Sequence, residues 1–234
     1  MSVTTRIVDY DQGGQTYEGF LAMPSGTPKA VVLVAHAWGG QSGFEQGKAK
    51  WLAEQGYAGF AVDVYGKGKR GETTEECQAL MEPLASNRTE LQSRLEFALN
   101  VAKTESDAAK AAAIGFCFGG LCVLDMARTN MDLEGVVSFH GLLGSAGNTA
   151  DKVMPQVLAL HGWDDPMATP EDVMTFSKEM TEAKADWQLH AYGNTLHAFT
   201  NPAAQNPDFG TQYKAEADRR SFAACADFLN EILG

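Results

Sequence analysis

The chain has few of the features that mark secreted, membrane-spanning or nucleic-acid-binding proteins. Only 4 of its 234 residues are cysteines, and their irregular spacing argues against a disulfide framework and for a reducing compartment. The first ten residues lack the apolar run of a signal peptide, and no stretch reaches transmembrane length. Positive charge is scarce, because 18 Lys and Arg stand against 30 Asp and Glu, a net charge of −12. We therefore expect a cytoplasmic protein with no nucleic-acid and no membrane partner.

Short apolar segments alternate with helical patterns, which is typical of an α/β protein with a single mostly parallel sheet and helices on both faces. The sequence begins with a predicted hairpin, Thr5–Tyr10 and Thr16–Met23, around the turn Asp11–Gly14. Six more predicted strands bring the total to eight: Val31–Ala35, Gly59–Val62, Ala111–Ile114, Val136–Phe139, Val157–His161 and Gln188–Tyr192. The predicted helices are Phe44–Gln55, Thr74–Lys103 with an interruption near Pro83, Phe118–Arg128, Pro170–Ala183 and Tyr213–Leu233. Without an internal repeat or linker, residues 1–234 are expected to form one domain.

The segment Ala111–Gly120, with the sequence AAAIGFCFGG, carries the strongest functional signal. An apolar strand enters a Gly-x-Cys-x-Gly-Gly turn that leads directly into a helix, as in a nucleophile elbow. The elbow holds its central residue, Cys117, at strained backbone angles and requires small neighbours, which are Gly115, Gly119 and Gly120. The N-terminus of the helix favours the thiolate of Cys117. Cys117 is therefore predicted to be a nucleophile, with a buried packing role or a phosphate-binding turn as alternatives.

An acid and a histidine follow the nucleophile in the order that this architecture requires. The predicted strand Val157–His161 leads into the turn HGWDDP, which contains Asp164 and Asp165, and His197 lies in the loop after the last predicted strand. Cys117, Asp165 and His197 then all follow the C-terminal ends of predicted strands. In an open parallel sheet the active site lies at these ends. We choose Asp165 as the acid because the third residue after the glycine clears the strand end, and Asp164 is the alternative.

These separated motifs together resemble the dienelactone hydrolase family of α/β-hydrolases. The likeness runs nearly from end to end and also includes His36–Gly40, Asp63–Gly68, Val137–Gly141 and His197–Pro202. The resemblance implies an α/β-hydrolase fold and a hydrolase of lactones or small carboxylic esters that uses a Cys–His–Asp triad. It implies no cofactor and no metal ion. A small-molecule ester or lactone is the expected partner, and the expected state is a monomer or weak homo-oligomer.

The mechanism that follows assigns a role to each residue. His197, held by Asp165, takes the proton of Cys117, which then attacks the carbonyl carbon. The backbone N–H groups of Trp38 and Phe118 are expected to stabilise the oxyanion. Water activated by His197 finally hydrolyses the thioester.

The sequence departs from the family pattern beside the proposed site. Ala37 stands where characterised dienelactone hydrolases carry a glutamate assigned to pairing with the cysteine, and Ala198 and Asn201 replace a serine and an arginine. We expect a roomier and less cationic pocket that suits neutral esters, larger lactones or, promiscuously, phosphotriesters. The candidate substrate-binding residues are His36, Ala37, Tyr65, Arg70 and Trp163.

Several of the remaining residues have a structural interpretation beside a functional one. The segment Tyr65–Arg70 either binds an acid group or forms a solvated cationic loop, which we favour. Trp38 and Trp163 are pocket walls or core aromatics. The histidines His36 and His140 are predicted to bind backbone groups, and structural roles are predicted for His161, His190 and Cys122.

Two other function classes stay open. One is another thiol enzyme on the same fold, an acyltransferase or a hydrolase of C–C or C–halogen bonds. A dehalogenase of this fold normally uses a carboxylate nucleophile, which Cys117 is not. The other is a non-catalytic module in which Cys117 senses oxidation, but such a sensor would not need Asp165.

Overall fold

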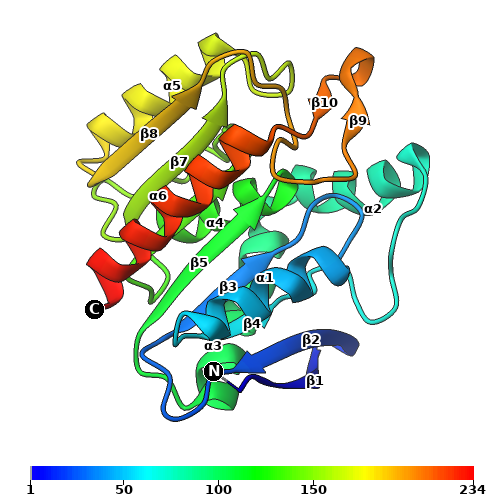
Figure 1. The fold of residues 1–234 in the computed structure, drawn as a ribbon, viewed down its shortest axis with the longest axis vertical. Coiled ribbons are helices and arrows are strands. Elements are labelled where there is room, and N and C mark those ends of the chain that lie inside the picture. The colour runs from blue at the N-terminus through cyan, green and yellow to red at the C-terminus, as the bar shows by residue number, and fades with distance from the viewer. Residues whose placement is uncertain (1) are drawn as a thin grey trace. The chain divides into compact units, whose positions relative to one another are not determined.

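The computed structural model describes residues 2–234 and contains the predicted eight-stranded, mostly parallel sheet. The strands of this sheet are β1 (Thr4–Gln12), β2 (Gln15–Met23), β3 (Val31–Ala35), β4 (Ala58–Ala61), β5 (Ala111–Phe116), β6 (Gly135–Phe139), β7 (Gln156–Gly162) and β8 (Trp187–Tyr192). Their order in the sheet is β1-β2-β4-β3-β5-β6-β7-β8 (Figure 1). A separate pair consists of β9 (Gln205–Asn206) and β10 (Thr211–Gln212).

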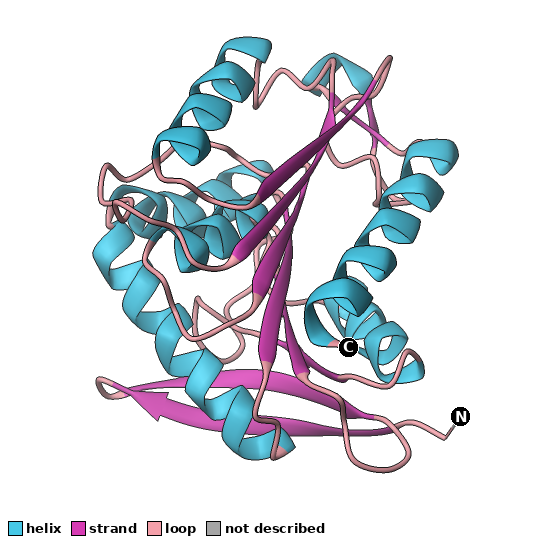
Figure 2. Ribbon diagram, turned by 90° about the vertical axis from the view of Figure 1, so that its left-hand side faces the viewer, coloured by secondary structure: helices cyan, strands magenta, loops and turns pink. Residues whose placement is uncertain are grey.

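Residues 2–234 contain six α-helices, which agree closely with the predicted ones. They are α1 (Gly43–Glu54), α2 (Thr74–Ser86), α3 (Arg88–Ser106), α4 (Phe118–Arg128), α5 (Pro170–Glu182) and α6 (Ala215–Leu233), and a single 3-10 turn spans Pro207–Phe209. Within residues 2–234, no helix combines the length and the apolar character needed to cross a membrane. The chain forms two compact units, the first up to Ile114 with Leu233, and the second from Gly115 to Ile232 with Gly234. In each unit, helices lie on both sides of the strands (Figure 2).

One predicted boundary is wrong: the break in the second helical segment lies at Asn87 and not near Pro83. Pro83 lies inside α2, in its last turns, where the loss of one N–H donor does not end the helix. The Asn87 side chain accepts a hydrogen bond from the Glu90 amide at 3.2 Å and so caps the start of α3. The Asn87 cap, and not Pro83, therefore determines where α2 ends and α3 begins.

In the first unit, alternation along β4 directs neighbouring residues to opposite faces of the sheet. A Cβ atom on Gly59 would lie 2.2 Å from the carbonyl oxygen of Ala49, so this face is in direct contact with α1. The next residue, Phe60, points the other way, and its ring lies 6.2 Å from that of Tyr10. Tyr10 in turn lies 6.1 Å from Phe97 of α3. The glycine in β4 therefore sets how closely α1 approaches the sheet.

In the second unit, β6 separates its two covering helices in the same way. The Ser138 hydroxyl lies beneath Gly120 of α4, where an added Cβ would approach it to 2.6 Å. The ring of the next residue, Phe139, faces α6 and stacks on Phe222 at 4.8 Å and on Phe116 at 4.8 Å. This aromatic stack forms the core on the α6 side, while small residues allow α4 to pack closely on the other side.

The close contact between β4 and α1 predicts opposite effects for two Gly→Ala substitutions. Gly59→Ala should destabilise the protein by about 3 kcal/mol, because the new methyl group overlaps the Ala49 backbone. Gly47→Ala, at an exposed position inside α1 with no atom within 4 Å of the new Cβ, should stabilise it by about 1 kcal/mol through helix propensity. Urea unfolding of both variants measures this difference. Equal unfolding midpoints would contradict the proposed packing.

Candidate active site

The backbone at Cys117 has the strained geometry that the sequence predicts. Cys117 lies between β5 and α4 with φ 56° and ψ −116°, angles that a residue with a side chain rarely adopts. Its amide donates to the carbonyl oxygen of Phe139 at 3.1 Å, which ties the turn to β6. A Cβ on Gly115 would lie 2.0 Å from the carbonyl oxygen of Gly119. Gly115 is therefore required for the turn. The Cys117 side chain is half-buried.

Asp165 and His197 form a buried hydrogen-bonded pair. His197 Nδ1 donates to Asp165 Oδ2 at 2.6 Å, and both residues are 2% exposed. The other carboxylate oxygen, Oδ1, accepts from the Met167 amide at 2.8 Å, so both oxygens of Asp165 have a donor. Asp164, the alternative acid, is exposed. The geometry therefore distinguishes the two neighbouring carboxylates, and only Asp165 orients the imidazole.

Backbone contacts hold His197 in place from both sides. The His197 amide donates to the carbonyl oxygen of Gly210 at 2.9 Å, and its carbonyl accepts from the Gln212 amide at 3.1 Å. The next residue, Ala198, has φ 55°, so the chain turns sharply after the histidine. A left-handed conformation at a residue with a side chain is costly, and the surrounding contacts must maintain it.

The charge environment of His197 favours its protonated form. Burial disfavours the imidazolium, but the charge of Cys117 and the hydrogen bond to Asp165 outweigh it and raise the pKa of His197 to about 10. The charge of Cys117 and a hydrogen bond with its sulfur both contribute to the raised pKa, so His197 and Cys117 interact. The second unit thus brings Cys117, His197 and Asp165 into one interacting set.

The pKa of His161, another buried histidine near this set, is shifted in the opposite direction to that of His197. His161 is 2% exposed at the end of β7, and desolvation lowers its pKa. The charges of Asp165 and His197 both act on it, in opposite directions. The structural role of His161 stays a prediction.

The candidate substrate-binding residues of the first unit engage backbone groups. His36 accepts from the Val64 amide at Nε2, 3.3 Å away, so Nδ1 carries the proton and donates to Ala37 O at 2.7 Å. The Tyr65 hydroxyl donates to the Trp38 carbonyl at 2.9 Å. The Arg70 guanidinium donates to Lys69 O at 2.7 Å. We therefore interpret these three polar groups as stabilising the loops in which they lie. The contacts do not support the prediction that the three residues bind substrate.

The remaining predicted site residues divide between the two units. Phe118 is the first residue of α4, and the amides of a first helical turn face the N-terminal end of the helix. Trp38 and Ala37 lie in the loop after β3 in the first unit, and both are half-buried. Trp163 is 44% exposed in the turn that contains Asp165.

Two polar clusters of the second unit were not anticipated from the sequence. The first is the pair of His140 and Thr200, whose Nε2 and Oγ1 atoms lie 2.8 Å apart, although His140 was expected to bind backbone. The second centres on Arg128, which is fully buried and binds both oxygens of Glu179 at 2.9 and 2.8 Å. Neither pair is close in sequence, so no local pattern indicates it.

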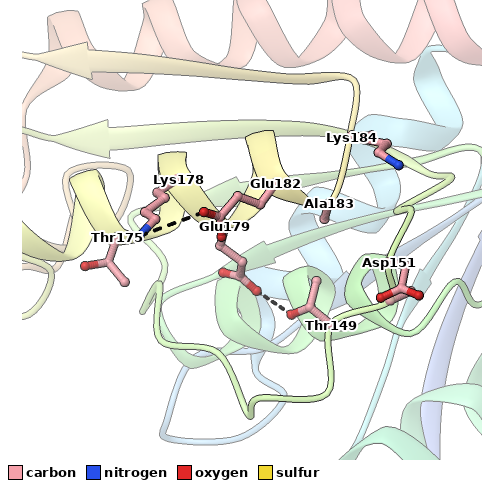
Figure 3. Close-up of a pocket in the computed structure, with 9 residues that line it drawn as sticks. Thr149, Asp151, Thr175, Lys178, Glu179, Glu182, Ala183 and Lys184 are labelled. Atoms are coloured by element: carbon pink, nitrogen blue, oxygen red, sulfur yellow. Dashed lines mark hydrogen bonds and ion pairs between the residues drawn. The ribbon is translucent and has the colours of Figure 1, made fainter.

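A pocket of about 690 Å³ lies beside α5 and the segment 149–151 (Figure 3). Glu179 and Thr149 line it, and none of the three residues Cys117, Asp165 and His197 does. The Glu179 carboxylate turns toward the Thr149 hydroxyl, which donates to it, while Arg128 binds the same carboxylate. The Glu179 carboxylate of this pocket is therefore already paired within the protein.

Comparison with known proteins gives consistent matches. The model of the dienelactone hydrolase family matches residues 17–233. A dienelactone hydrolase-like promiscuous phosphotriesterase from metagenomic libraries has a structure similar to this chain, with a TM-score of 0.93, 31% identity and coverage of 100% of both chains. An uncharacterized protein of Caenorhabditis elegans is 36% identical over 147 residues, 60% of this chain and 93% of that protein. A carboxymethylenebutenolidase homolog of Xenopus tropicalis is 21% identical and covers 88% and 86% of the two chains.

The Asp165–His197 pair predicts a specific effect of removing one carboxylate. In Asp165→Asn the pKa of His197 should fall well below about 10, because the anionic acceptor that favours the imidazolium is lost. In the control Asp164→Asn, which changes an exposed carboxylate, the pKa of His197 should stay near its wild-type value. Nitrogen chemical shifts of the imidazole, followed by NMR against pH, measure both.

The same pair makes stability depend on pH with a defined sign. The folded pKa of about 10 lies above the ordinary value of 6.5, so the folded protein holds this proton more tightly than the unfolded chain. The advantage of wild type over Asp165→Asn in unfolding free energy should be complete below pH 6.5 and decline as the pH rises toward 10. A difference that instead grows over this range would contradict the pairing.

Proposed function

Because this chain belongs to the dienelactone hydrolase family, whose members are hydrolases acting on ester bonds, we propose that it hydrolyses carboxylic esters or lactones with a Cys117–His197–Asp165 triad. The single observation that carries the proposal is the buried 2.6 Å bond between His197 and Asp165, on a histidine whose pKa is raised by Cys117. A cysteine held in an elbow and attracted to an oriented imidazolium is the arrangement of an activated thiol nucleophile.

The resting enzyme holds Cys117 as a thiolate paired with the His197 imidazolium. The raised pKa of His197 keeps this proton on the ring at neutral pH. The amide dipoles at the start of α4, which begins one residue after Cys117, favour the thiolate further. His197 is therefore already protonated and can give this proton to the departing alkoxide.

Acylation begins when the Cys117 sulfur attacks the carbonyl carbon of the substrate. The carbonyl oxygen gains negative charge, which the backbone N–H groups of Phe118 and Trp38 stabilise in this proposal. Loss of one such donor typically raises the barrier by roughly 3 kcal/mol. When the tetrahedral adduct collapses, the C–O bond breaks and His197 gives its proton to the departing alkoxide, leaving a thioester.

Deacylation returns the enzyme to its starting state. His197, now neutral, takes a proton from water as the water oxygen attacks the thioester carbonyl. Collapse of this second adduct breaks the C–S bond and restores the thiolate and the imidazolium. A thiolate is a far better leaving group than an amine, so an amide adduct would collapse backwards. The proposed substrates are accordingly esters and lactones.

Neutral substrates fit the sequence of the site better than anionic ones. Ala37 and Asn201 stand where the family pattern has a glutamate and an arginine, so the charged groups of that pattern are missing. The net charge of −12 also disfavours the approach of anions. We infer that the preferred substrate is a small neutral ester or a larger neutral lactone.

A second candidate function is the hydrolysis of neutral phosphotriesters by the same triad. It is favoured by the likeness to the dienelactone hydrolase-like promiscuous phosphotriesterase, which is 31% identical over the full length of both chains. A phosphotriester is neutral and presents a tetrahedral centre that resembles the tetrahedral adduct of an ester. It therefore agrees with the roomier and less cationic pocket that we propose.

The proposed mechanism predicts a covalent intermediate on one particular cysteine. Wild type should give a burst of phenolate from a neutral aryl ester and an acyl adduct by intact mass, because acylation precedes hydrolysis. Cys117→Ala should lose both, with turnover reduced about 1,000-fold or more. Cys122→Ala is the matched control, since Cys122 is a buried thiol on the same helix and should keep the burst. Unchanged turnover in Cys117→Ala would disprove the proposed function.

The proposed pocket also predicts an order of substrates. The ratio kcat/KM should be higher for a neutral aryl ester than for anionic dienelactone, and an aryl dialkyl phosphate should be turned over slowly. All three activities should disappear together in Cys117→Ala, because one nucleophile serves them. If dienelactone is the best of the three, the inference of a neutral substrate is wrong. If the phosphotriester is cleaved equally well without Cys117, it uses a different site.

A further inference from the structure

Two residues of the segment that follows His197 contact the side chain of His140, which comes directly after β6. Phe199, which is fully buried, meets the His140 ring edge to face at 5.1 Å. Thr200 places its hydroxyl oxygen 2.8 Å from His140 Nε2. The His197 ring itself lies 5.1 Å from the His140 ring at an interplanar angle of 67°. His140 thus contacts the proposed base and two of the three residues that follow it.

His140 is itself held rigidly. Its backbone has φ 38°, and its amide donates to the carbonyl oxygen of Leu160 at 2.8 Å. The residue before it, Phe139, accepts the hydrogen bond from the Cys117 amide at 3.1 Å. Two consecutive residues at the end of β6 therefore hold the backbone of the proposed nucleophile and the ring of the proposed base.

We propose that His140 and Thr200 form a positioning pair that fixes the His197 imidazole relative to Cys117. The proposal rests on the function proposed above and adds two residues that act through His197 rather than on the substrate. Asp165 restrains the His197 ring at Nδ1, and the His140 ring restrains it from a second direction. Two restraints define the orientation of a planar ring, whereas one hydrogen bond still allows it to rotate.

The local backbone explains why such a restraint is needed. Ala198, directly after His197, has φ 55°, a conformation that an alanine adopts only when tertiary contacts maintain it. Phe199 and Thr200, the next two residues, each contact His140, and Phe199 also packs against Tyr192 at 5.5 Å. His140 and Thr200 are 2% and 1% exposed, so breaking their hydrogen bond leaves buried polar atoms that strain the loop. A displacement of His197 by a fraction of an ångström would weaken its pairing with Cys117.

The decisive comparison uses two buried threonines of the same loop. Thr200→Val removes the hydroxyl that pairs with His140 and keeps the shape of the side chain. Thr195→Val is the matched control, because Thr195 is equally buried but its hydroxyl donates locally to Gly193 O at 3.0 Å. We expect kcat for a neutral aryl ester to fall about tenfold in Thr200→Val with KM within twofold, and little change in Thr195→Val. Thr200→Ser should restore the wild-type value.

A second readout separates positioning from a general loss of structure. The rate at which iodoacetamide alkylates Cys117, measured against pH, reports how strongly His197 supports the thiolate. In Thr200→Val the rate at pH 6 should fall several-fold and the profile should move to higher pH, while Thr195→Val keeps the wild-type profile. Equal changes in both threonine variants, or an unchanged profile in Thr200→Val, would overturn the proposal.

A double-mutant cycle tests whether the two residues act together. His140→Phe keeps an aromatic ring against His197 and Phe199 but loses the bond to Thr200. If the pair acts through that bond, His140→Phe combined with Thr200→Val should be little worse than either change alone. Additive losses would overturn the proposal. If Thr200→Val fails to fold, His140→Phe alone should lower kcat about tenfold while Thr200→Ser, which keeps the hydroxyl, should not, and an unchanged kcat in His140→Phe would overturn the proposal. The alkylation profile does not depend on the natural substrate, so failure of ester hydrolysis in wild type remains a separate outcome.

Discussion

The strained backbone at Cys117 is the constraint on which the rest of the site depends. A residue held at φ 56° and ψ −116° costs of order 1–3 kcal/mol, and it persists only where the surroundings leave no alternative. The contacts that maintain the strained backbone of Cys117 are backbone contacts between small residues. Gly115 lies directly against Gly119, and Gly120 against Gly141, where an added Cβ would approach within 2.5 Å. The start of α4 is therefore held by steric exclusion, and the Cys117 sulfur is held with it.

Charge interactions among His197, Asp165 and Cys117 also stabilise the site. A buried imidazolium is unstable on its own, since burial alone would lower the pKa of His197. The buried carboxylate of Asp165 and the sulfur of Cys117 reverse this effect, and Asp165 in turn accepts two hydrogen bonds. The buried Asp165 carboxylate and the buried His197 imidazolium are each tolerable only because the other is present. This mutual dependence explains why Asp165 is buried while Asp164, one residue earlier, faces solvent.

Most of the secondary structure could be predicted because it follows from local chemistry. The hairpin turn contains Gly13 and Gly14, both with positive φ, and α5 begins at Thr169 with a capping box and Pro170. The break between α2 and α3 was harder to predict, because a proline near a helix end and an asparagine cap compete as signals. The cap prevails since it satisfies the first amides of the new helix, whereas the proline removes only one donor.

The sequence by itself determined the alternation of strands and helices, the glycine-flanked cysteine, and the order of nucleophile, acid and histidine. Each of these depends on neighbours within a few residues, where backbone sterics and side-chain periodicity act directly. Only the tertiary structure decided which carboxylate binds His197, and it alone brought His140 to Thr200, 60 positions away. The same holds for Arg128 and Glu179. Such choices depend on which polar groups are buried together, and burial is a property of the packed sheet rather than of any short segment.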